Sequence, residues 1–230
     1  MLYVGIAPGP GSLQLVALEE VRTPEPPIRL RATFFEPGSP AQVVAAIASL
    51  GREVAIGVGA PAGEGRACDA ELGERGIPPV PAFAAAHELY ERLGSFGLYT
   101  PGDGAGLREG QVEEGAFHSA RVFETSVEGV FAALQGRRLP ARRHPLGVAR
   151  RIDELVEDHI EDDGGELWHR RIEEIEAAAC ALAAHRYALA HANWLGDPSE
   201  GVIVLPGART PEHFSGEGVI PPVPRRPLPR

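Results

Sequence analysis

Two glutamates that lie far apart in the chain occupy positions suited to an active site. Glu124 closes a short apolar run, residues 121–124, which predicts a strand, and a helical pattern follows at once, so Glu124 should lie at the strand's carboxyl end. Glu176 lies in a predicted helix spanning residues 168–193. At about 100° per residue its side chain falls beside Ile172 and Ala179, on the packed side of that helix.

A carboxylate on the packed side of a helix needs a partner, because burying it bare costs several kcal/mol. Glu124 and Glu176 could converge on one hard cation, and a site made only of oxygen ligands suits Mg²⁺ or Mn²⁺. In the alternative interpretation, Glu176 forms a salt bridge with one of the many arginines. The residue pattern alone leaves both interpretations open.

Arginine supplies all 22 basic residues, and the sequence contains no lysine. This absence excludes Walker-type phosphate loops, Schiff-base lysines and lysine general bases. Arg66 and a cluster at residues 137–151, which includes Arg142 and Arg143, could bind phosphate or carboxylate through forked hydrogen bonds. Alternatively, the cluster pairs at helical spacing with the eight acids of residues 153–166.

Composition restricts the partners and the compartment. The net charge is −10, so a protein that coats nucleic acid generally is excluded, and nucleic acid could bind only through the local arginine patch. Cys68 and Cys180 have no metal-ligand spacing, which favours a reducing cytoplasm. No apolar run approaches the roughly 18 residues of a membrane helix, so no membrane is expected. Homo-oligomerisation is left open.

The order of the predicted elements is that of an α/β protein with a mixed β-sheet flanked by helices. A strand at 202–205 and a long Gly-rich loop at 100–118 accompany the elements around the two glutamates. The sequence predicts one domain, residues 1–215, and a Pro/Arg-rich C-terminal tail, residues 216–230. The remaining expected elements are strands at 2–6, 13–18, 28–35 and 53–58, and helices at 39–50, 82–93 and 125–135.

Five blocks of residues, in order along the chain, resemble a bacterial and archaeal family. It is a domain-of-unknown-function family, number four-two-nine, whose members are described as predicted nucleases with a ribonuclease-H-like fold. The resemblance covers nearly the whole chain. The blocks are Ala60-Pro61-Ala62-Gly63 with Arg66-Ala67-Cys68-Asp69, Phe123-Glu124-Thr125-Ser126 leading into residues 131–136, Arg142-Arg143 through Leu155, Glu176-Ala177-Ala178-Ala179, and Val202-Ile203-Val204-Leu205-Pro206.

The resemblance implies a cleft at the strand ends in which carboxylates hold divalent metal and a phosphodiester is the substrate. This chain departs from that plan at three positions. Ala7 and Gly59 stand where the family carries aspartate, and Glu176 replaces a third aspartate. With Asp69, Glu124 and Glu176 left, a standard two-metal site is excluded, and a single Mg²⁺ or Mn²⁺ would bind weakly through a shell made mostly of water.

Two hypotheses about function follow. In the first, the carboxylate site is degenerate and the protein is a catalytically inactive relative that binds a phosphate-bearing or other anionic ligand. In the alternative, it is an active divalent-metal-dependent phosphodiesterase or nuclease. Glu124, Glu176 and Asp69 would then be catalytic, Glu124 and Glu176 would hold the metal, and substrate would bind to Arg66, Arg142 and Arg143.

Overall fold

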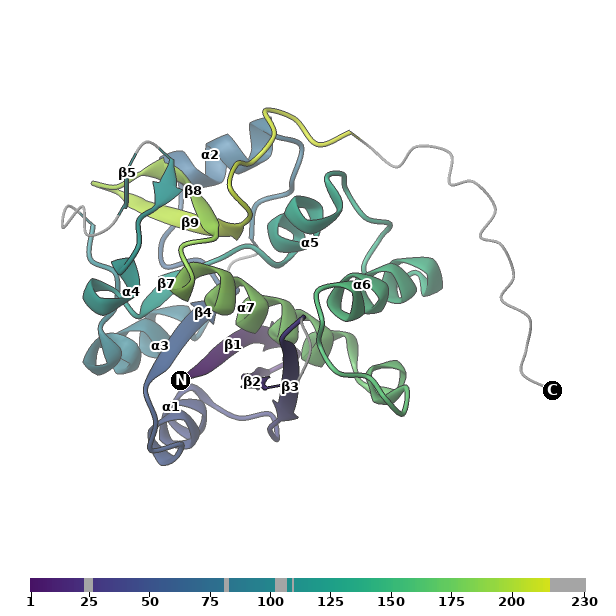
Figure 1. Cartoon of the computed structure of the whole chain (residues 1–230). Coiled ribbons are helices and arrows are strands. Elements are labelled where there is room, and N and C mark those ends of the chain that lie inside the picture. Colours follow the sequence, from purple (N-terminus) through teal and green to yellow (C-terminus); the bar gives the residue numbers. More distant parts are fainter. Residues whose placement is uncertain (23–26, 81–82, 102–106, 109, 216–230) are drawn as a thin grey trace.

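The computed structural model describes residues 1–22, 27–80, 83–101, 107–108 and 110–215. Helices and strands are interspersed along the chain (Figure 1). The strands are β1 (Leu2–Gly9), β2 (Ser12–Val21), β3 (Arg29–Phe34), β4 (Val54–Val58), β5 (Leu107–Arg108), β6 (Gln111–Val112), β7 (Val122–Glu124), β8 (Ala192–Asp197) and β9 (Gly201–Pro206). The α-helices are α1 (Pro40–Ser49), α2 (Ala67–Glu74), α3 (Ala86–Leu93), α4 (Ala116–Ser119), α5 (Val127–Gln135), α6 (Pro145–Glu157) and α7 (Ile172–Ala188), and the 3-10 helices are η1 (Gly94–Phe96) and η2 (Glu166–His169).

Within the described residues the strands form one mixed sheet, in the order β3-β2-β1-β4-β7-β9-β8-β6-β5. The first three strands are antiparallel neighbours, because a tight turn and a short connection join them. Strands β4, β7 and β9 then follow β1 in parallel. Their carboxyl ends therefore meet at one edge of the sheet, which is the edge where Glu124 ends β7.

Side chains alternate between the two faces of the sheet. Val4 and Ile6 of β1 pack with Val43 and Ile47 of α1, whereas Tyr3 of β1 packs in the core that contains α7. In Figure 1, α7 crosses the sheet over β1, and α1 and α3 lie together away from it. The chain thus builds two hydrophobic cores, one on each face, which leave little freedom to the strand ends between them.

Glycine and alanine let α7 approach the strands very closely. A Cβ atom on Gly5 would lie 1.9 Å from the Ala177 carbonyl oxygen, and one on Gly57 would lie 2.5 Å from that of Cys180. The helix itself presents small buried residues there, from Ala177 through Ala184 with few interruptions. Backbone-to-backbone packing of this kind fixes the position of Glu176, which directly precedes Ala177 on α7, near the strand ends.

The predicted fold class, α/β with a mixed sheet flanked by helices, is confirmed. Several boundaries differ from the prediction. The long helix ends at Ala188, and residues 192–197 form strand β8, because Ala190 has a positive φ that turns the chain. The residue pattern does not predict α2, whose apolar periodicity is weak. The described residues of the loop at 100–118 include β5, β6 and most of α4.

Local capping explains where the other helices begin. Ser39 caps α1, with Pro40 in the first turn. Ser126 caps α5, since its hydroxyl accepts from the Gly129 N–H, and the hydroxyl of the preceding Thr125 donates to the Val204 carbonyl of β9.

Three further sequence expectations concern the cysteines, a membrane and the tail. Both cysteines are free and buried. Helices in the described part of the chain are too short or too polar to span a membrane. The predicted tail at 216–230 lies outside the described residues.

Candidate functional site

Glu124 lies at the end of β7 and is held by Arg66. The two side chains form a forked pair, with Nη1 to Oε2 at 2.6 Å and Nη2 to Oε1 at 2.7 Å. The backbone N–H of Ala62 also donates to Oε2, at 2.9 Å. Burial raises the pKa of the Glu124 carboxyl, and the hydrogen bonds from Arg66 only partly oppose that effect. Three donors therefore already bind this carboxylate.

Asp69 belongs to the same group as Glu124 and contacts the other side of Arg66. Its carboxylate accepts from the backbone N–H and the guanidinium of Arg66, each at 3.3 Å, at the start of α2. Arg66 is thus placed between two acids, and its preceding loop is fixed by Tyr90, whose hydroxyl donates to the Ala60 carbonyl at 2.7 Å. Three predicted site residues, Arg66, Asp69 and Glu124, are brought together.

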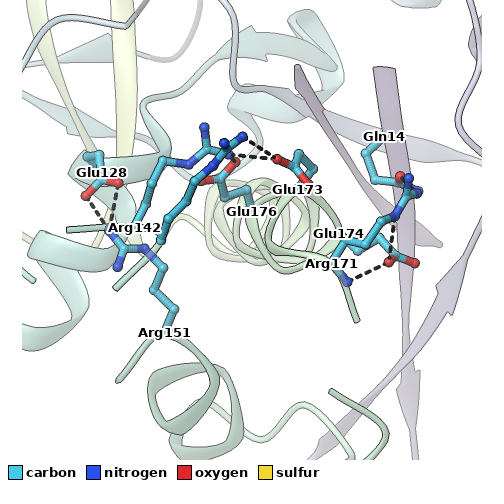
Figure 2. Close-up of polar contacts among 9 residues, drawn as sticks. Gln14, Glu128, Arg142, Arg151, Arg171, Glu173, Glu174 and Glu176 are labelled. Atoms are coloured by element: carbon cyan, nitrogen blue, oxygen red, sulfur yellow. Dashed lines mark hydrogen bonds and ion pairs between the residues drawn. The ribbon is translucent and has the colours of Figure 1, made fainter. Parts of the chain in front are cut away.

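Glu176 lies in a second group, at the beginning of α7. Arg142 donates through Nη2 to its Oε2 at 2.5 Å and also reaches Glu173 at 3.4 Å (Figure 2). Arg143 approaches Glu173 at 3.5 Å and has a mostly exposed side chain. Burial raises the pKa of Glu176 to about 7, although Arg142 acts in the opposite direction. Glu176 is 5% exposed, which confirms that it faces the packed side.

Glu128 and Arg151 form a third pair beside this second group. Arg151 of α6 is fully buried and donates through Nη2 to both carboxylate oxygens of Glu128, at 2.7 Å (Figure 2). Its Nη1 donates to the carbonyls of Pro140 and Gly147, and its guanidinium carbon lies 5.3 Å from the centre of the Phe131 ring. The pair therefore joins α5 to α6 and fixes one wall of the space in front of Glu176.

A cavity of about 810 Å³ opens between these elements. It lies at the carboxyl ends of β1 and β4, where Pro8, Gly9 and Gly59 contribute to its lining. Its volume lies within the range of ligand pockets, roughly 300–1,000 Å³. Glu124, Asp69 and Arg66 do not line it, so the predicted site residues divide between two groups. The charged lining residues are Glu128, Arg138, Arg142, Arg143, Glu173 and Glu176.

The carboxylates as arranged do not fit a divalent cation. Each of Glu124 and Glu176 accepts from a guanidinium at 2.7 Å or less, and a cation would have to displace it. Within the described part of the chain, no three His, Cys, Asp or Glu side chains form a group that could hold a metal. The assignment of one cation to Glu124 and Glu176 stays a prediction.

Ala7 and Gly59, the two positions at which the sequence resemblance implies aspartates, are packing positions in this structure. Ala7 is fully buried. A Cβ atom on Gly59 would lie 2.8 Å from Cys180 Sγ and 3.0 Å from Val127 Cγ2, so a larger side chain would displace α7 or α5. A carboxylate side chain at Gly59 would therefore require repacking of these helices.

The sequence did not single out Glu128, Arg138 or Glu173, and it grouped Arg151 only with its neighbours. Glu173 could have been found, because it precedes Glu176 by three residues and so lies on the same side of α7. Arg151 gave no such signal, since pairing with the acids of residues 153–166 seemed available. Among the described arginines of residues 137–151, only Arg150 forms an ion pair with an acid of that run, Asp153 at 3.8 Å, whereas Arg142, Arg143 and Arg151 bind acids of other helices.

Comparisons with known proteins add one structural likeness. A solved structure of Thermus thermophilus RuvC superposes with a TM-score of 0.44 and 15% sequence identity, covering 82% of this chain and 95% of that chain. No protein-family model matches the chain, and no curated protein matches it. The resemblance to a family of predicted nucleases therefore stays a prediction.

Proposed function

We propose that this protein binds a small phosphate-bearing anion in the cavity beside Glu176 and does not hydrolyse phosphodiesters. The observation that carries the proposal is the Arg142–Glu176 contact at 2.5 Å inside a cavity that two further arginines line. An arginine occupies the place a catalytic cation would need, so the site keeps its means of binding an anion and lacks metal-assisted chemistry.

The balance of charge in the cavity supports an anionic ligand. Arg151 neutralises Glu128, and Arg142 neutralises Glu176, which leaves Arg138 and Arg143 facing the single carboxylate of Glu173. The raised pKa of Glu176, about 7, lowers the negative charge further near neutral pH. A local excess of positive charge in a protein of net charge −10 is an attractive site for phosphate.

Arg142 also retains unused donor capacity. Its Nε–H is buried and has no hydrogen-bond acceptor among the described residues, although its Nη2 contacts Glu173 and Glu176. A phosphate that drew the guanidinium slightly away from α7 would supply acceptors for this donor, together with Arg143, whose side chain is 70% exposed. Nucleic acid would reach these arginines only through an end or a splayed phosphate, since the rest of the protein is acidic.

Calorimetric titration with inorganic phosphate tests the proposal. The wild type should bind, and Arg142→Ala and Arg143→Ala should each weaken binding by about tenfold or more, because each removes a charge-assisted hydrogen bond. Arg92→Ala is the matched control, since Arg92 pairs with Glu88 on α3 and does not line the cavity. Its affinity should equal that of the wild type. Absence of phosphate binding by the wild type would overturn the proposal.

A second measurement separates binding from catalysis. Purified tag-free protein should leave single- and double-stranded oligonucleotides intact in millimolar Mg²⁺ or Mn²⁺, and neither ion should raise the melting temperature. Cleavage that Glu124→Gln or Glu176→Gln abolishes would instead establish the active phosphodiesterase hypothesis.

A further inference from the structure

A second part of the lining of the same cavity is apolar, and we call it the apolar wall. It comes from two segments that link helices: the residues after α2 and the residues between α5 and α6. Phe83 also contributes, and Val127 on α5 continues the surface toward the charged side. The apolar lining residues are Ile77, Pro78, Pro79, Val80, Phe83, Val127, Leu139 and Pro140.

Part of this wall is open, unlike an ordinary piece of the core. Pro78 and Pro79 are exposed and Val80 is half-buried, while Ile77 and Leu139 behind them are buried. Ile77 is tied down, since its N–H donates to the Leu72 carbonyl at the end of α2 at 3.1 Å. The proline rings fix the φ angles of the next two residues, Pro78 and Pro79. This part of the apolar wall therefore has a restricted backbone and faces the cavity, which favours a flat apolar group over water.

Taking the proposed anion site as its basis, we infer that the ligand is a monophosphate ester of an apolar, ring-bearing alcohol. The phosphate lies against Arg142 and Arg143, and the ring lies against the wall formed by Pro79, Val80 and Phe83. Inorganic phosphate would leave most of the 810 Å³ to water. A fully polar ester would bring hydroxyl groups against an apolar wall that cannot satisfy them.

The volume and the lining of the cavity suit a small ligand of this class better than a polymer. The charged cluster and the apolar wall line one common space, so a single small molecule can contact both. An extended nucleic-acid strand would need positive charge continuing beyond the cavity, and the chain is acidic as a whole. A ring attached directly to the phosphate oxygen can contact the apolar wall while the phosphate contacts the arginines. Such a ligand has few rotatable bonds, so binding costs it little conformational entropy.

A ligand series on the wild-type protein tests the inference. Titrations with inorganic phosphate, glycerol phosphate, phenyl phosphate and 1-naphthyl phosphate should give affinities that rise only with the aromatic esters. Phenyl phosphate should bind about tenfold tighter than glycerol phosphate, and naphthyl phosphate tighter again, because each ring removes apolar area from water. Equal affinity for glycerol phosphate and the aromatic esters would overturn the inference and leave the phosphate site standing.

Two variants test whether the higher affinity for aromatic esters comes from the apolar wall. Phe83→Ala and Val80→Ser should reduce the preference for phenyl over glycerol phosphate while leaving the affinity for inorganic phosphate within about twofold. If Phe83→Ala fails to fold, Val80→Ser still tests the inference, because Val80 is only half-buried on a loop. A variant that weakens all four ligands equally would contradict the inference. If no ligand binds the wild type, the proposed function itself fails.

Discussion

The guanidinium of Arg66 and the carboxylate of Glu124 face each other as a fork, with both terminal nitrogens within 2.7 Å of the two oxygens. Arg66 immediately precedes α2 and Glu124 ends β7, so the pair ties a helix that the sequence did not predict to the centre of the sheet. Glu124 is 5% exposed, and its charge is tolerated only because these hydrogen bonds replace water.

Removal of Arg66 alone should destabilise the protein strongly. Arg66→Met leaves a buried carboxylate with a single backbone donor, and the free energy of unfolding should fall by about 3–5 kcal/mol at pH 8. Adding Glu124→Leu to this variant should recover much of the loss, since the unpaired charge is then absent. Chemical denaturation of both single variants and the double variant gives the coupling energy directly.

The same experiment has an internal control on the surface. Arg92→Met removes a pair with Glu88 that is nearly half exposed, and it should change the unfolding free energy by less than about 1 kcal/mol. A loss in Arg66→Met as small as that of Arg92→Met would mean that the fork contributes little and that Glu124 reaches water by another route.

The close contact between α7 and β1 gives a second prediction. Gly5→Ala would place a methyl group 1.9 Å from the Ala177 carbonyl, against backbone that cannot yield cheaply, so the variant should lose several kcal/mol or fail to fold. Gly73→Ala is the matched control, because Gly73 lies in α2 with open space around its Cβ position. There alanine should stabilise the protein by about 0.5–1 kcal/mol. Thermal unfolding of both variants is sufficient, and a well-folded Gly5→Ala protein would contradict the packing.

The sequence identified those features that depend on periodicity. The strand end at Glu124 and the inward face of Glu176 followed from short apolar runs and from helical phase, and both are confirmed. The partners of these glutamates could not be predicted, because Arg66 and Arg142 come from distant segments and any of 22 arginines was eligible. Of the two interpretations of Glu176 left open by its pattern, a salt bridge with an arginine is the one in the structure.

The pKa of Glu176 gives a prediction about pH. Its folded-state pKa, about 7, is above the ordinary value of 4.5, so folding favours the protonated form. That contribution to stability is fully present below pH 4.5 and is lost as the pH rises through 7. Glu176→Gln mimics the neutral carboxyl at every pH. The stability of the variant relative to the wild type should therefore increase between pH 4.5 and 7.5.

Paired denaturation curves at four or five pH values measure this slope. Glu176→Gln also weakens the contact with Arg142, which lowers the stability of the variant by a constant amount. This shifts the curve of the stability difference against pH and leaves its slope unchanged. Glu91→Gln, at an exposed position on α3, is the matched control for replacing a glutamate by glutamine. A difference for Glu176→Gln that does not change with pH would show that Arg142 holds the carboxyl ionised over the whole range.

His185 on α7 should produce the opposite slope. Its Nε2 lies 3.3 Å from Glu20 Oε1, which also accepts from the Tyr3 hydroxyl at 2.8 Å, and the two rings are edge to face. Burial, assisted by the nearby positive charge of Arg186, lowers the pKa of His185 to about 4 from the ordinary 6.5. The folded protein therefore binds fewer protons than the unfolded chain in this interval, and stability falls as the pH drops from 6.5 to 4.

His185→Gln should remove that acid sensitivity and leave a protein whose stability depends less on pH in this interval. At about 1.4 kcal/mol per pKa unit, the wild type should lose a few kcal/mol relative to the variant by pH 4. Because Glu176 stabilises the protein over an overlapping interval, the wild-type curve shows only the difference of the two effects. The double variant with Glu176→Gln separates them, since the sites lie over two turns apart on α7 and should add. Persistence of the full acid loss in His185→Gln would assign it to other groups.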